Sequence, residues 1–362
     1  MTQDPHAPDE SAPSGGAASG SEPVTTGGAR ASQPAPSMDG LAIATRGLVK
    51  RYGTQPALQG LDMNVPTGAV YGFLGPNGAG KTTLMRILVG LLRPDAGEVR
   101  LLGEPFHRGD RRRLFGVGSL IEQPAFYPYL SGRDNLRVFA AAGPYTPTTR
   151  IDEVLEYVGL RDRARSKVKT YSLGMKQRLG IAVALVSDPQ LLLLDEPGNG
   201  LDPAGIVAMR ELLRFLTAQG KTVLVSSHIL PEVQQLADVV GIVDRGRLVR
   251  EGPLERLLGE SAHVRIRVDA DDVARVIELL APRGTELEPP MAGDPLHRWL
   301  VVRVTSDHAA EVNQRLAEQG VFVSGLETKS DLEALFLSLT TTLPTGGRVG
   351  PPWAEPSAGG RI

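Results

Sequence analysis

The residues best suited to chemistry form the glycine-rich run GPNGAGKTT at residues 75–83. The run fits a G-x-x-x-x-G-K-T pattern between an apolar stretch at 69–74 and helical periodicity over 82–92. Glycines let backbone N–H groups turn toward one anion, and the start of a helix adds positive potential. In such a loop the lysine reaches the outer phosphates of a nucleotide, and the following threonine offers its hydroxyl to Mg²⁺. The predicted nucleotide-contacting residues here are Gly75, Pro76, Asn77, Gly78, Ala79, Gly80, Lys81, Thr82 and Thr83.

A second polar pair, Asp195 and Glu196, follows the leucine run 191–194. Such a run predicts a buried parallel strand, and these strands present functional side chains at their C-terminal ends. Asp195 is suited to a contact with Mg²⁺, and Glu196 to polarising a water molecule aimed at the terminal phosphate. An acidic pair at this position can also cap a helix. Its coexistence with Lys81 favours the catalytic interpretation.

A third apolar stretch, KTVLVSSHIL at residues 221–230, predicts a strand that ends at His228. A histidine after a strand is often structural. If this strand neighbours the strand that ends at Asp195, His228 could instead contact the terminal phosphate or the attacking water.

Composition divides the chain into three regimes. Residues 1–38 are rich in Pro, Gly, Ser and Ala, and 341–362 are similar, so both are predicted to be disordered tails. Met38 is a candidate alternative translation start because patterned sequence begins there. Residues 39–258 alternate strand-like and helical patterns, as in a layered α/β domain.

Residues 263–340 predict a second, small α+β domain. Strand-like segments 263–268, 299–304 and 321–327 alternate with helical segments 272–281 and 308–320. This order favours a ferredoxin-like module. No cluster within it suggests catalysis, so a role in dimer contact or regulation is expected.

Composition also excludes several classes of protein. The formal net charge of -2 provides no basic field for nucleic acid, and the chain has no Cys for disulfides or thiolate metal sites. No stretch of about 18 apolar residues predicts a membrane span, and the start lacks the pattern of a signal peptide.

GPNGAGKTT, LLLLDEP, the following GLD, and SSHIL, in this order, resemble the ATP-binding cassette (ABC) ATPases. The resemblance covers residues 41 to about 258. It implies an α/β fold of the P-loop type with a helical subdomain at about 124–186, beside the small C-terminal domain. It also implies ATP and Mg²⁺ as cofactors.

The same resemblance implies further nucleotide contacts. Tyr52 matches the position that stacks on adenine, although an exposed strand tyrosine would give the same sequence. YSLGMKQRL, at residues 171–179, matches the signature motif, so Ser172 and Gly174 would bind the γ-phosphate of a second subunit. It departs from the common LSGGQ form at Tyr171, Leu173 and Met175. Asp202 belongs to the GLD motif.

Segment 118–136 departs from the usual family pattern. Alignment on Pro124 and Pro128 puts Glu122 where these ATPases usually have glutamine, as in bacitracin and lantibiotic self-protection exporters. Glu122 could ligate Mg²⁺ or orient water. A shift of one residue would give this role to Gln123.

The resemblance implies a homodimer that closes on ATP and drives a separately encoded ABC-2 type permease in the drug and antibiotic export branch. The chain would be cytoplasmic and peripheral on the inner face of the membrane, with no nucleic acid partner. A soluble cassette ATPase not coupled to transport, and a regulatory binder without catalysis, are the alternatives. The transported substrate is not evident from the sequence, because the permease mainly selects it.

Overall fold

The computed structural model describes residues 40–122, 125–143, 146–289, 294, 296–329 and 332–340. The predicted tails 1–38 and 341–362 lie outside these residues.

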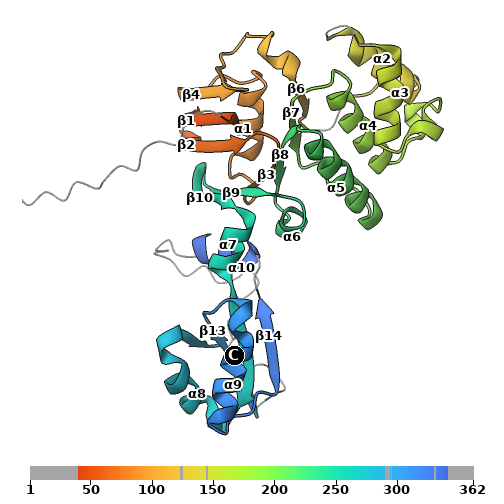
Figure 1. Cartoon of the computed structure of the whole chain (residues 1–362). Helices are drawn as coiled ribbons and strands as arrows, with labels where there is room; N and C mark the ends of the chain where they lie inside the picture. The colour runs from red at the N-terminus through yellow and green to blue at the C-terminus, as the bar shows by residue number, and fades with distance from the viewer. Residues whose placement is uncertain are drawn as a thin grey trace, which may run out of the picture. The chain divides into compact units, whose positions relative to one another are not determined.

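The central element is a six-stranded sheet in the order β10-β9-β3-β8-β7-β6, in which only β10 runs antiparallel (Figure 1). The adjacent strands β3, β8 and β7 are fully buried and mostly apolar, as expected for parallel strands covered on both faces. The strands are β3 Val70–Leu74, β6 Val117–Leu120, β7 Leu191–Asp195, β8 Thr222–Ser227, β9 Val239–Asp244 and β10 Arg247–Pro253.

A second sheet is antiparallel, with the order β2-β1-β4-β5. Its inner residues, such as Ile43 and Leu61, share one apolar cluster with Phe73 of the central sheet and Leu84 of α1. The strands are β1 Leu41–Tyr52, β2 Gln55–Pro66, β4 Ala96–Leu101 and β5 Glu104–Pro105.

Three helices of this part begin at residues whose side chains cap them. Ser131, Ser172 and Asp202 accept a backbone N–H at the starts of α2, α4 and α5, respectively. A common apolar cluster joins α2, α3 and α4 to the buried leucines of β7. The helices are α1 Lys81–Leu88, α2 Gly132–Ala141, α3 Thr148–Tyr157, α4 Leu173–Leu185, α5 Pro203–Ala218, α6 Leu230–Gln234 and α7 Leu254–Ser261. Short 3-10 turns are Arg113–Gly116, Arg161–Arg163, Val168–Thr170, Ala270–Asp272, Ala281–Arg283 and Ser306–His308.

The chain after α7 forms a β-α-β-β-α-β module around an antiparallel sheet of order β12-β13-β11-β14. This is the element order of a split β-α-β motif. Val264, Ile266 and Leu300 of the sheet pack with Val276 of α8 and Val312 of α9. The strand β12 is short and has no alternating pattern that would predict it from the sequence. The elements are β11 His263–Asp269, α8 Val273–Leu280, β12 Thr285–Leu287, β13 His297–Val302, α9 Ala309–Glu318 and β14 Gly325–Lys329.

The last described helix, α10 Leu332–Thr340, packs against α6 and α7. Leu332 and Leu335 join a cluster that contains Val233 of α6 and Leu257 of α7. The Leu332 backbone N–H also donates to Gln234 Oε1 at 3.1 Å. The segment after the module therefore contributes to the core beneath the central sheet.

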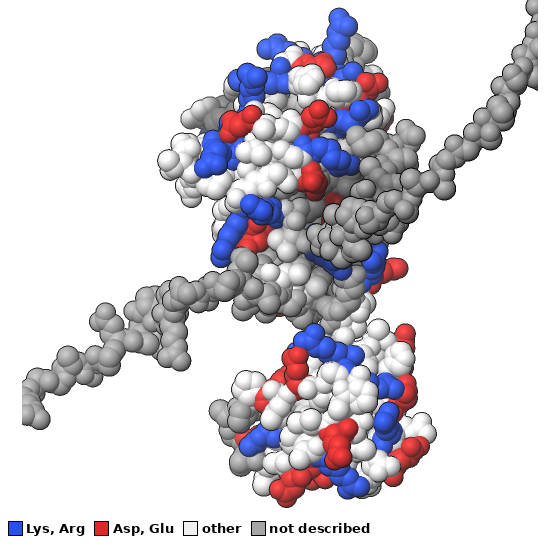
Figure 2. Space-filling model, turned by 90° about the vertical axis from the view of Figure 1, so that its left-hand side faces the viewer, with Lys and Arg blue, Asp and Glu red and all other residues white. Residues whose placement is uncertain are grey.

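On the face shown in Figure 2, basic and acidic side chains are interspersed rather than gathered by sign. Within the described ranges, no helix combines the length and apolar character needed to cross a bilayer.

The packing of α10 gives a stability prediction. Leu332→Ala should lower the free energy of unfolding by about 2–4 kcal/mol, because it removes a fully buried side chain and leaves a cavity. Leu326→Ala, at a 39% exposed position in β14, should cost less than about 1 kcal/mol. Urea titration followed by circular dichroism measures both. Equal losses would contradict the packing of α10.

Candidate active site

The phosphate loop joins β3 to α1 and approaches neighbouring backbone too closely for side chains at two glycines. Gly80 has φ 104°, and a Cβ there would lie 2.5 Å from the carbonyl oxygen of Ala57. A Cβ at Gly75 would lie 2.4 Å from the carbonyl oxygen of Val243. Glycine at both positions therefore permits these close approaches. The loop leads into the start of α1, where free backbone N–H groups attract an anion.

Lys81, the first residue of α1, is 6% exposed. Its Nζ donates to the carbonyl oxygens of Gly75 at 2.8 Å and Pro76 at 3.3 Å. The same Nζ lies 3.4 Å from Glu196 Oε1. The ammonium group is therefore held at the loop, where it can pair with phosphate oxygens.

Asp195 connects three elements of the site. Its Oδ2 accepts from Thr82 Oγ1 at 2.9 Å, and its Oδ1 accepts from the hydroxyl of Ser226. Asp195 is 8% exposed. A hydroxyl and a carboxylate are hard oxygen ligands, so Thr82 and Asp195 fit Mg²⁺. Ser226, the first residue of the SSHIL segment, is a partner that the motif alone did not identify.

Glu196 and His228 are brought together at the ends of β7 and β8. His228 Nδ1 lies 2.5 Å from Glu196 Oε2, and Asn199 Nδ2 donates to the same oxygen at 3.1 Å. Glu196 has φ 50°, in the left-handed region, and its N–H donates to Ser226. Such strain persists only where surrounding contacts impose it, and it is common at active sites. Asn199 is a second partner that the sequence analysis missed.

Glu122 lies outside this cluster of contacts. It has φ 63°, and its exposed carboxylate forms an ion pair with Arg86, one turn after Thr82 in α1. The hydrogen bond to Glu122 raises the pKa of the Arg86 guanidinium, with a smaller contribution from Tyr52. Within the described ranges, Glu122 makes no hydrogen bond or ion pair with Thr82 or Asp195. Gln123 and Pro124 fall outside those ranges.

Tyr52 ends β1 and is 48% exposed, so its ring is accessible to a planar ligand.

The signature segment lies at the start of α4. Ser172 caps the helix by accepting the Met175 N–H at 3.2 Å, and its side chain is exposed. Gly174 lies in the first turn. Tyr171 is 5% exposed, and its hydroxyl donates to the Arg163 carbonyl oxygen at 2.7 Å. The departure from LSGGQ at Tyr171 therefore fills the core and leaves the exposed serine in place.

Asp202 caps α5 by accepting the Gly205 N–H at 2.9 Å. Its predicted contact with nucleotide stays a prediction.

The parallel sheet, phosphate loop and acidic strand end define a P-loop nucleoside triphosphatase cassette. The sequence profile described as "ABC transporter" matches residues 58–199. The chain is 39% identical to the bacitracin transport ATP-binding protein BcrA of Bacillus licheniformis over 312 residues, covering 85% of this chain and 99% of that protein. It therefore belongs to the ABC transporter family of ATP-binding subunits, which are ATPases, as the sequence motifs predicted.

Two further relatives and one solved structure are similar to this chain. The lantibiotic transport ATP-binding protein SrtF of Streptococcus pyogenes is 44% identical, covering 58% of this chain and 90% of that protein. The daunorubicin resistance ATP-binding protein DrrA3 of Streptomyces coeruleorubidus is 38% identical, covering 83% and 96%. The dimeric ATP-binding cassette MJ0796 bound to ADP and Pi is 25% identical, with a TM-score of 0.54, covering 59% of this chain and 98% of that one. The predicted likeness to the antibiotic export branch is thus confirmed.

Removal of the buried ammonium gives a binding prediction. Lys81→Ala should weaken ATP binding by roughly 10²-fold or more, because the outer phosphates lose a desolvated cation. Equilibrium titration with a fluorescent ATP analogue measures the change. Lys329→Ala, at an exposed position of β14, is the control and should bind normally. An unchanged dissociation constant in Lys81→Ala would exclude this role.

Proposed function

We propose that this chain hydrolyses ATP as one of two identical nucleotide-binding subunits and thereby drives a separately encoded membrane permease that exports an antibiotic, drug or lipid-like compound. The observation that carries the proposal is the convergence of Lys81, Asp195, Glu196 and His228 at one edge of the parallel sheet. A strained carboxylate held by a lysine, an asparagine and a histidine is typical of an active site and supports a catalytic role.

Each side chain has a definite task in this proposal. Lys81 pairs with the outer phosphates of ATP, and Thr82 and Asp195 hold Mg²⁺. When bound there, Mg²⁺ would supply positive charge that neutralises the phosphates. Glu196 accepts the proton of the attacking water, as its partly accessible carboxylate and strand-end position allow. His228 orients Glu196 by donating from Nδ1, which leaves Nε2 to contact the terminal phosphate or the attacking water.

A second subunit would complete each site. Ser172 and Gly174 present an exposed helix start, a suitable place for the γ-phosphate held by another subunit. A symmetric homodimer with two composite sites follows from this arrangement. The dimeric state of the similar cassette MJ0796 supports it. ATP would join the subunits and hydrolysis would release them.

The names of the relatives support export as the process. Bacitracin, a lantibiotic and daunorubicin are named for three ATP-binding proteins that are 38–44% identical to this chain. An ABC-2 type permease would place the chain at the inner face of the cell membrane, in the cytoplasm. Copurification with a membrane protein would distinguish this function from that of an uncoupled ATPase.

The C-terminal region 263–340, which comprises the module and α10, would serve dimer contact or regulation. Phe336 of α10 lines a cavity of 240 Å³ together with Pro76 and Asn77 of the phosphate loop and His228. This position gives the C-terminal segment a physical route to the nucleotide site.

The catalytic role of Glu196 is tested with Glu196→Gln. This variant should bind ATP but hydrolyse it roughly 10²-fold more slowly, the scale of a lost general base. The dimer should then accumulate with ATP, as size-exclusion chromatography would detect. Glu255→Gln, at an exposed position of α7, is the control and should behave like the parent. Near-normal turnover of Glu196→Gln would refute the assignment.

Glu122 gives a separate prediction. Glu122→Gln should be tolerated, because an amide oxygen still ligates a metal or accepts from water, whereas Glu122→Ala should reduce magnesium-dependent hydrolysis. Gln123→Ala should have a much smaller effect. Steady-state ATPase rates across a magnesium titration compare the three variants, with the permease present. A severe loss in Gln123→Ala beside a silent Glu122→Ala would assign the role to Gln123.

A further inference from the structure

Two short loops control the position of the Glu196 carboxylate. Asn199 reaches Glu196 Oε2 from the loop after β7, and His228 reaches the same oxygen from the loop after β8. Only Pro197 and Gly198 separate Glu196 from Asn199. A change in the spacing between these loops would therefore move one of the two groups away from Glu196.

Glu232, four residues after His228, fills the space between the loops. A Cβ built on Gly198 would lie 2.9 Å from Glu232 Oε2, 3.6 Å from Cδ and 3.7 Å from Oε1. The whole carboxyl group thus lies against the Cα of Gly198. Glu232 thus connects α6, which follows the His228 loop, with the loop that carries Asn199.

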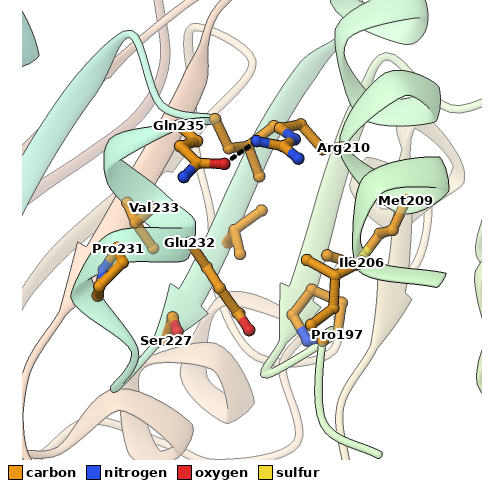
Figure 3. A pocket seen from close by; sticks show the side chains of 12 residues that line it. Pro197, Ile206, Met209, Arg210, Ser227, Pro231, Glu232, Val233 and Gln235 are labelled. Atoms are coloured by element: carbon orange, nitrogen blue, oxygen red, sulfur yellow. Dashed lines mark hydrogen bonds between the residues drawn. The ribbon is translucent and has the colours of Figure 1, made fainter. Parts of the chain in front are cut away.

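The carboxyl group borders a cavity of 110 Å³ between these loops and α5. Figure 3 shows Glu232 extending from α6 toward the side formed by Pro197, while Arg210 and Gln235 bind each other at the opposite end. Within the described ranges, Glu232 makes no hydrogen bond or ion pair. Its position is therefore set by packing against the Gly198 backbone rather than by a cation of its own.

Electrostatics place Glu232 close to the catalytic pair. Burial raises the pKa of the Glu232 carboxyl, nearby His228 lowers it, and nearby Glu196 raises it. Glu232 therefore lies near both members of the pair in which His228 Nδ1 contacts Glu196 Oε2.

We propose that Glu232 is a positioning residue for ATP hydrolysis, which spaces the Pro197–Asn199 loop from α6 so that Asn199 and His228 hold the same oxygen of Glu196. This inference rests on the proposed function, since it assumes that Glu196 acts on the water. Displacement of a catalytic group by about 1 Å can cost up to about 10² in rate, so a spacer that never touches ATP can affect turnover.

The test compares Glu232→Ala, which removes the spacer, with Glu232→Gln, which keeps its shape. Glu232→Ala should lower kcat about tenfold or more, with KM for ATP within about twofold, because the nucleotide contacts are unchanged. Glu232→Gln should retain most of the activity. Both variants should melt within about 3 °C of the parent. Glu255→Ala is the matched surface control.

A double-variant cycle tests whether Glu232 acts through the loop. In an Asn199→Ala background, Glu232→Ala should lower kcat by a smaller factor than in the parent, because the two residues position one group. Glu196→Gln, measured alongside, tests the proposed function separately from the role of Glu232. If it is active, the proposed function fails. If it is inactive, three results would each overturn this inference alone. The first is a kcat of Glu232→Ala within twofold of the parent, and the second is an equal loss of kcat in Glu232→Gln. The third is a double variant whose loss of kcat equals the product of the two single losses.

Discussion

The hydrogen bonds from Thr82 and Ser226 to Asp195 hold the site together, because they connect the starts or ends of three separate elements. They require that β3, β8 and β7 end at the same edge of the sheet. The parallel register provides this, since it pairs Leu74 with Ser227 and Asp195 with Ser226. A slip of one residue would turn Asp195 to the other face of the sheet. The slip would also move every buried side chain of the strand to the opposite face of the sheet, and the loss of their packing opposes it.

The buried sheet is regular, whereas the loops at its edge are strained and polar. Glu196 has a left-handed backbone, and its N–H is satisfied by Ser226 of the next strand. Such a conformation costs about 1–3 kcal/mol and survives only where neighbouring contacts impose it. In the mechanism that we propose, the contacts around Glu196 therefore position its carboxylate before ATP binds, which reduces the reorganisation needed during hydrolysis.

The structure also separates residues that share a motif. In the signature segment, Tyr171 is a core residue bonded to the Arg163 carbonyl oxygen, while neighbouring Ser172 is exposed at the helix start. The motif can thus vary at its buried positions as long as the volume is filled. Glu122 likewise has two possible partners, an arginine on α1 in this structure and a metal or water in the closed state that we propose.

The sequence alone determined the phosphate loop, the carboxylates after the leucine run and the family, because these features depend on residue types at short, fixed spacings. It also indicated most elements of the C-terminal module from local periodicity. Only the tertiary structure revealed Ser226 and Asn199 as partners in the site, the Glu122–Arg86 pair, the contact of Glu232 with Gly198 and the packing of α10 on α6 and α7. Most of these contacts join residues far apart in the chain, and their loop and helix geometry has no short sequence pattern. Strand register and the packing of buried side chains decide them, and neither can be read from local spacing.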